Sequence, residues 1–243
     1  MRRIILGPIR LLVILLPLTL AACAGLDSKT LGGLIQGDGG PLDEETVAAG
    51  LKEALRVGTE RTVGVTSRTD GFFGNALIRI VMPEQLQSMA KTLRTVGFGG
   101  QVDEFEVAMN RAAERAAGEA TGIFWQAITR MSLSDAFGIL NGGETAATDY
   151  FHVRTADPLR QKFRPIVTEK MTEVGLYRIY EDIAEQYNSL PLGSKPLIDL
   201  EEYVTERALG GLFTVLGQEE KRIREDPAAR TTALLRKVFD RSQ

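Results

Sequence analysis

Apolar residues recur at intervals of three and four positions almost throughout the chain from Leu42 onward. Val47, Leu51 and Ala54 begin this pattern, which places apolar side chains on one face of a helix. No run alternates apolar and polar residues as a half-buried strand does. The single run that could be extended, residues 77–82, is too short to form a sheet alone. The spacing therefore predicts an all-α fold, an irregular bundle of about eight to ten helices with no sheet.

Capping residues predict where several of these helices begin. Asp43 can cap a first helix that runs to about Thr66. Ser132 with Asp135 forms a capping-box-like start for a short helix, and Asp199 can open a long helix near the C-terminus. These side-chain oxygens would accept hydrogen bonds from backbone N–H groups that have no partner inside the helix.

Glycine and proline predict where other helices end or break. Gly97 and Gly175 each follow a valine at the end of a helical pattern, where glycine can take the left-handed conformation. One helix is expected over residues 144–153. Asp157-Pro158 predicts the start of a separate helix, in which Pro165 is expected to force a kink or a break.

The first 22 residues have the composition of a secretory signal peptide. Arg2 and Arg3 give it a positive start, and an apolar stretch to Leu20 leads to two small residues, the second of which is Ala22. Arg10 and two prolines make the stretch a poor permanent membrane span, which needs about 20 mostly apolar residues. Cleavage is predicted after Ala22.

The sequence Leu20-Ala21-Ala22-Cys23 resembles the bacterial lipobox, in which the cysteine thiol receives a diacylglyceryl group and becomes the new N-terminus. Cys23 is the only cysteine in the chain, and the alternative is an ordinary signal peptide followed by a free thiol. Two or three acyl chains anchor a protein stably, because each buried methylene contributes about 0.8 kcal/mol. Ala24, where aspartate would resemble an inner-membrane retention signal, points to the outer membrane. We therefore expect a lipid-anchored protein on the periplasmic face of the outer membrane.

The segment that follows the predicted lipid attachment is rich in glycine. Residues 23–42 are predicted to form a flexible tether, and residues 43–243 a single helical domain. Because the only cysteine is acylated in this interpretation, no disulfide is expected within the domain. A chain of this length can bury enough apolar surface to fold without one.

The charge of the chain argues against a nucleic-acid partner. It has 29 basic and 32 acidic residues, and the predicted signal peptide contains three of the basic ones and no acid. The mature protein therefore has 26 basic and 32 acidic residues, a formal charge of −6. An acidic chain has no electrostatic footprint for nucleic acid. Charge would not draw it to an anionic lipid surface either, so membrane contact is assigned to the N-terminal lipid.

Several patterns resemble parts of catalytic motifs but remain incomplete. Ser88 and Lys91 form an S-x-x-K, and Ser134-Asp135-Ala136 approaches an S-D-N, as in penicillin-recognising enzymes. The second motif lacks its asparagine, and no strands are predicted to hold such a site. His152, the single histidine, is predicted to be a structural or surface residue, since no G-x-S-x-G motif accompanies it. One histidine and one acylated cysteine exclude a zinc site, and we predict no catalytic residue, no metal and no cofactor.

One predicted helix carries a polar face whose role is open. Its polar residues are Glu104, Glu106, Asn110, Arg111 and Glu114. A solvated face is the favoured interpretation and a ligand site is the alternative, with Arg111 and Glu114 close enough to pair. Arg230-Thr231-Thr232 is interpreted in the same way, with Thr231 as a start for the final helix.

Five separated parts of the chain together resemble one bacterial family. They are Gly50–Leu55, Ile78–Pro83, Met109–Glu114, Ile139–Gly143 with Ala146–Thr148, and Asp226–Thr232. They are similar to the proteins grouped as domain of unknown function 4197, over about residues 45–240. Met82 stands where the family would have leucine, a change that fits the same apolar position. The resemblance implies a helical periplasmic domain, often in a lipoprotein, and no catalytic residues come with it.

The sequence leaves two functions open. The favoured one is a binding or structural module that contacts an unknown envelope protein or holds an apolar ligand between its helices. The alternative is a cell-envelope hydrolase that uses carboxylates alone, with Glu104, Glu114, Asp135 and Asp149 as candidates. Two facing carboxylates in one cleft, one of them desolvated, would favour the hydrolase.

Overall fold

The structure is a computed structural model that describes residues 43–191 and 197–239, so the predicted signal peptide, Cys23 and the tether lie outside it. The described residues form nine α-helices and one turn of 3-10 helix without a strand, which confirms the predicted all-α bundle. The elements are α2 (Glu44–Thr66), α3 (Glu84–Thr95), α4 (Gly99–Ala117), α5 (Ala120–Thr129), α6 (Leu133–Leu140), α7 (Ala146–Glu173), α8 (Leu176–Asn188), α9 (Leu200–Glu225), η1 (Pro227–Ala229) and α10 (Ala233–Phe239). Among these helices, none is both long enough and apolar enough to cross a lipid bilayer.

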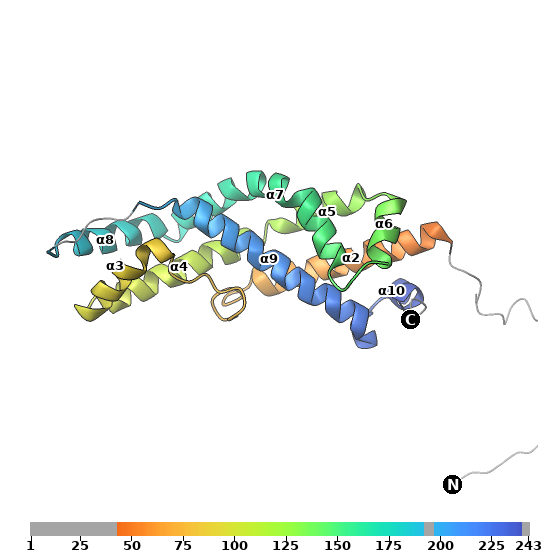
Figure 1. Cartoon of the computed structure of the whole chain (residues 1–243), viewed down its shortest axis with the longest axis horizontal. Helices are drawn as coiled ribbons and strands as arrows, with labels where there is room; N and C mark the ends of the chain where they lie inside the picture. The colour runs from red at the N-terminus through yellow and green to blue at the C-terminus, as the bar shows by residue number, and fades with distance from the viewer. Residues whose placement is uncertain (1–42, 192–196, 240–243) are drawn as a thin grey trace, which may run out of the picture. The chain divides into compact units, whose positions relative to one another are not determined.

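The long helices α2, α7 and α9 build the middle of the domain. α9 packs against both of the others and against α4. Figure 1 shows α9 crossing the bundle, with α3 and α8 beside α4 at one end and α5, α6 and α10 beside α2 at the other. The site described below lies at the end that contains α5 and α6.

A single apolar core runs through these helices. Its fully buried aromatic side chains are Phe72, Phe105, Phe124, Phe151 and Phe163. Phe72 does not belong to a helix: it lies in the segment of residues 67–83 between α2 and α3 and packs on α9 at Gly211. A Cβ at Gly211 would come within 2.5 Å of the Phe72 ring, so only glycine allows this close approach.

The predicted helix starts are confirmed where a side chain caps the backbone. Asp43 and Asp199 each accept a hydrogen bond from the backbone N–H three residues on, at 2.7 and 2.8 Å. Ser132 and Asp135 form the reciprocal capping box that begins α6. These interactions involve neighbours in the sequence, which is why the sequence alone identifies them.

The helix ends predicted at two glycines are confirmed as well. Gly97 and Gly175 have φ angles of 98° and 72°, in the left-handed region, and follow the ends of α3 and α7. After α3, Phe98 donates its backbone N–H to the carbonyl of Leu93 at 2.8 Å, the wide turn expected where glycine ends a helix.

The prediction of two helices over residues 144–174 is wrong, because α7 runs without a break from Ala146 to Glu173. Pro158 and Pro165 both lie inside it. They are seven residues apart and both exposed, so they share the side of the helix that faces water. Water can satisfy the carbonyl groups that lose their N–H partners on that side.

The buried side of α7 carries a stripe of residues at regular intervals of four. Its members are Phe151, Thr155, Leu159, Phe163, Val167 and Met171. Burying five apolar side chains of this size contributes about 7–15 kcal/mol, whereas two prolines in a helix interior cost about 6 kcal/mol. Tertiary packing therefore keeps α7 continuous where local preference predicts a break.

Candidate functional site

The incomplete catalytic patterns do not come together in the fold. Ser88 and Lys91 lie on the exposed surface of α3. His152 is exposed on α7, where its ring lies 5.0 Å from that of Phe213, so it is a surface imidazole as predicted. Among residues 43–191 and 197–239, no group of three or more His, Cys, Asp or Glu side chains is placed to hold a metal ion.

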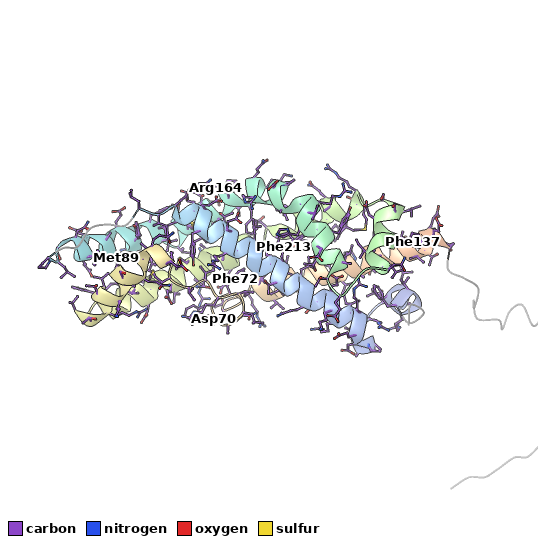
Figure 2. The ribbon with its side chains drawn as sticks, in the orientation of Figure 1. Asp70, Phe72, Met89, Phe137, Arg164 and Phe213 are labelled. Atoms are coloured by element: carbon purple, nitrogen blue, oxygen red, sulfur yellow. The ribbon has the colours of Figure 1, made fainter. Side chains whose placement is uncertain are left out.

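Glu114 is buried, so the predicted solvated face is wrong at this position. Its side chain is only 3% exposed. One carboxylate oxygen accepts the backbone N–H groups of Phe72 and Phe73, both at 3.1 Å. The other accepts from Arg111 at 2.6 Å, and Arg111 also pairs with Asp70 at 2.7 Å. Figure 2 labels Asp70 and Phe72, which both lie in the segment between α2 and α3. Helical spacing identifies residues that share a face, but it does not reveal which loop covers that face.

Asn110, one turn before Glu114 on α4, is buried for the same reason. Its side-chain oxygen accepts the N–H of Ile80 at 2.9 Å, and its amide donates to the carbonyl oxygens of Ile80 at 2.7 Å and Glu106 at 2.8 Å. Two side chains of α4 thus hold residues 67–83 against the bundle. Their polar atoms are used in this contact, so the cluster is structural.

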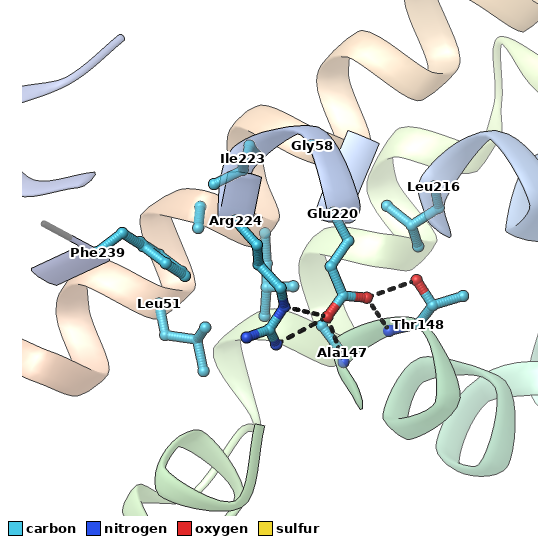
Figure 3. A pocket seen from close by; sticks show the side chains of 11 residues that line it. Leu51, Gly58, Ala147, Thr148, Leu216, Glu220, Ile223, Arg224 and Phe239 are labelled. Carbon is cyan, nitrogen blue, oxygen red and sulfur yellow. Dashed lines mark hydrogen bonds and ion pairs between the residues drawn. The ribbon is translucent and has the colours of Figure 1, made fainter. Parts of the chain in front are cut away.

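A second buried cluster, which the sequence did not identify, surrounds Glu220 of α9 (Figure 3). Its carboxylate accepts the backbone N–H groups of Ala147 at 2.9 Å and Thr148 at 2.8 Å, and the Thr148 hydroxyl at 2.8 Å. Arg224 pairs with Glu220 at 2.9 Å and donates to the Ile139 carbonyl oxygen at 2.9 Å. The carboxylate therefore caps the N-terminus of α7, where the helix dipole favours negative charge.

The space beside Glu220 is too small to hold a ligand. Leu51, Leu216, Ile223 and Phe239 help to line a cavity of about 20 Å³ there. This volume accommodates a single water molecule. The spacing of Glu220 and Arg224 indicates a pair on one helix, but no sequence pattern reveals that the pair caps α7.

Arg230 is also buried, so its interpretation as a solvated residue is wrong. It is 2% exposed and donates to the carbonyl oxygens of Ile223 at 3.0 Å and Arg224 at 2.6 Å. The last helix, α10, starts later than expected. The hydroxyl of Thr232, rather than that of Thr231, accepts the backbone N–H three residues on, at 3.2 Å.

An open cleft of about 400 Å³ lies between α5, α6 and α7, and we call it the α5–α7 cleft. Its lining residues are Ile123, Gln126, Ala127, Arg130, Asp135, Tyr150, Arg154, Thr155, Pro158 and Lys162. Ligand sites commonly measure about 300–1,000 Å³. The wall formed by α7 presents residues 150, 154, 158 and 162, each of which precedes a member of the buried stripe.

Positive charge exceeds negative charge in the lining of the α5–α7 cleft. The Arg154 guanidinium lies 3.5 Å from the Asp135 carboxylate. Arg130 and Lys162 are exposed and form no ion pair within the described part of the chain. The lining of the cleft therefore contains three cations and one carboxylate.

Asp135 is already engaged by its own neighbours. It accepts the Ser132 hydroxyl at 2.7 Å and the Tyr150 hydroxyl at 3.2 Å. These hydrogen bonds, above all the one from Ser132, lower the pKa of Asp135. Burial raises the pKa of Tyr150, and the adjacent carboxylate adds to this effect, so the phenol keeps its proton and remains a donor. The cleft thus combines a fixed anion with cations that it neutralises only in part.

The carboxylates considered for a hydrolase do not form a desolvated pair. Asp135 and Asp149 line a neighbouring hollow of about 390 Å³. The acid of such a pair must be kept protonated by its surroundings, whereas the pKa of Asp135 is lowered. Asp149 is exposed and accepts the Thr145 hydroxyl at 3.0 Å. Glu104 is exposed on α4, whereas Glu114 on the same helix is buried and anchors residues 67–83. The two acids therefore do not form a pair in one cleft.

Comparison with known proteins identifies a family. No curated protein and no solved structure matches the chain. A family model described as "Protein of unknown function (DUF4197)" matches residues 41–240, a range that contains every described helix. Two of the segments that suggested this family from the sequence contain the buried residues Asn110, Glu114 and Arg230. The chain therefore belongs to the DUF4197 family of proteins of unknown function.

Proposed function

We propose that this protein is a lipid-anchored binding module of the cell envelope and that its ligand site is the α5–α7 cleft. The observation that carries this proposal is the charge of the lining. Arg130, Arg154 and Lys162 share the cleft with one carboxylate, Asp135. A cleft lined by excess positive charge concentrates anions even in a protein of negative net charge. The ligand is therefore an anion.

The charges of the two buried clusters differ from those of the cleft, because they have partners inside the domain. Glu114 and Glu220 are each paired with an arginine and with backbone N–H groups inside the domain. The charges of Arg130 and Lys162 have no such partner among the described residues and remain available to a ligand. Buried polar groups with internal partners stabilise a fold, whereas accessible unpaired cations around a cleft can bind.

The anchor in this proposal rests on the N-terminal sequence. The Cys23 thiol receives the lipid, and cleavage after Ala22 makes Cys23 the N-terminus. Residues 23–42 then connect it to the helical domain at the periplasmic face of the outer membrane. Growth with an alkynyl palmitate analogue tests this part. The wild-type chain is expected to be labelled and to fractionate with the outer membrane, and Ser28→Ala serves as a matched control. Cys23→Ser is expected to lose both properties, and an unlabelled wild-type chain would contradict the anchor.

Native mass spectrometry of the full chain, extracted from its own envelope, tests the binding role. We expect an anionic small molecule to accompany the wild-type protein and to be lost from Arg130→Gln/Lys162→Gln. The control is Arg68→Gln/Lys91→Gln, which removes one arginine and one lysine from exposed positions outside the cleft. Retention of the same ligand by both double variants would contradict the cleft as the site, and a wild-type protein without an anion would contradict the proposed function.

A further inference from the structure

The order of the residues on α7 gives the α5–α7 cleft two cationic ends. Arg154, Pro158 and Lys162 follow one another at intervals of four along the wall of the cleft. An α-helix rises 1.5 Å per residue, so the backbone positions of Arg154 and Lys162 lie about 12 Å apart along the helix axis. The residue between them is apolar and has no N–H group to offer to a ligand.

The wall formed by α5 adds two apolar side chains to the middle of the cleft, beside the polar Gln126. Ile123 and Ala127, one turn apart, line the same cleft as Pro158. Arg130 follows the end of α5, just before the turn that leads to α6 and to Asp135. Because Asp135 contacts Arg154, the two arginines belong to the same end of the cleft.

The charges are balanced between the two ends. At the first end, Arg130 and Arg154 carry two positive charges, and Asp135 removes one of them. At the other end, Lys162 carries one positive charge and has no ion-pair partner among the described residues. Each end therefore offers about one positive charge. The surface between them includes the apolar side chains of Ile123, Ala127 and Pro158, together with the polar Gln126.

We infer, on the basis of the proposed function, that the α5–α7 cleft binds a linear molecule with an anionic group at each end and an apolar segment between the two. Carboxylate and phosphate both satisfy this description, because arginine and lysine bind either group. A molecule with one anionic group leaves one cationic end without a partner. A short dianion reaches only one end, because its charges lie closer together than Arg154 and Lys162.

Isothermal titration calorimetry on the mature chain, residues 23–243 with Cys23→Ser, tests this inference without detergent. The probes are sebacate, its single-headed counterpart decanoate, the short dianion adipate, and the α,ω-bisphosphonate with the chain length of sebacate. Sebacate is expected to bind about two- to fivefold more tightly than decanoate or adipate, the effect of one additional partly exposed ion pair. Comparison of sebacate with the bisphosphonate distinguishes a carboxylate from a phosphate ligand. Tighter binding of either probe than of decanoate and adipate supports the inference.

The Lys162→Gln variant tests the two-ended geometry directly. It is expected to reduce sebacate affinity to that of decanoate while leaving decanoate affinity unchanged, and Lys91→Gln on α3 is the matched control. If neither sebacate nor the bisphosphonate binds better than decanoate and adipate, the inference is overturned. If the probes then lose affinity in Arg130→Gln/Lys162→Gln, the proposed anion site stands without the two-ended ligand. If no probe binds at all, the inference falls and the proposed function with it.

Discussion

Replacement of Glu220 by alanine is expected to destabilise the domain strongly. The Glu220 side chain is 8% exposed and is the acceptor for three donors at the start of α7. Its removal also leaves Arg224, which is 16% exposed, without its carboxylate partner. Breaking a buried, hydrogen-bonded charge pair costs about 3–5 kcal/mol. For a domain of this size, that loss lowers the melting temperature by about 6–20 °C.

Urea unfolding followed by far-UV circular dichroism measures this effect. Glu220→Gln retains an oxygen that can accept the N–H groups, so its loss should lie between those of the wild type and Glu220→Ala. Glu185→Ala, at an exposed position on α8, is the matched control and should change stability by less than about 0.5 kcal/mol. If Glu220→Ala unfolds at the same urea concentration as Glu185→Ala, the carboxylate does not stabilise the junction of α7 and α9.

Three further predictions concern a close helix contact, a capping group and an interior proline. Gly211→Ala should destabilise by about 1–3 kcal/mol, because its Cβ would lie 2.5 Å from an aromatic carbon; Gly210→Ala, with no atom within 4 Å, should be neutral or stabilising in the same urea assay. Because the folded-state pKa of Asp135 is lowered, its contribution to stability is present at neutral pH and is lost as the pH falls below its ordinary value of 3.8. Ser132→Ala should raise the pKa of Asp135 towards that value in a carbon-13 NMR titration, and an unchanged pKa would contradict the assigned cause. Pro165→Ala should stabilise by about 1–2 kcal/mol, since alanine can donate the missing backbone hydrogen bond; a loss of stability would refute our account of the continuous α7.

The helix starts could be predicted from the sequence because capping is local. Asp43, Ser132 and Asp199 each act on a backbone group within three residues, and Gly97 and Gly175 determine their own backbone conformation. The same local chemistry gave a wrong prediction for α7, because its prolines lie on the exposed side of a helix whose other side is buried by distant elements.

The buried acids could not be predicted because their partners are distant in the sequence. Glu114 accepts backbone N–H groups from the segment between α2 and α3, and Glu220 accepts them from the start of α7. The α5–α7 cleft could be predicted only in part. The spacing of Arg154, Pro158 and Lys162 is present in the sequence, but the apolar residues of α5 that face them become apparent only in the folded domain.

NMR mapping of the binding surface tests the anion-binding role of the α5–α7 cleft most directly. Backbone amide signals of the mature chain, residues 23–243 with Cys23→Ser, would be followed during titration with sebacate. The largest shifts are predicted in residues 123–130 and 150–162, and they should disappear in Arg130→Gln/Lys162→Gln. Shifts centred instead on α3 and α8, or equal shifts in the double variant, would contradict a ligand site between α5 and α7.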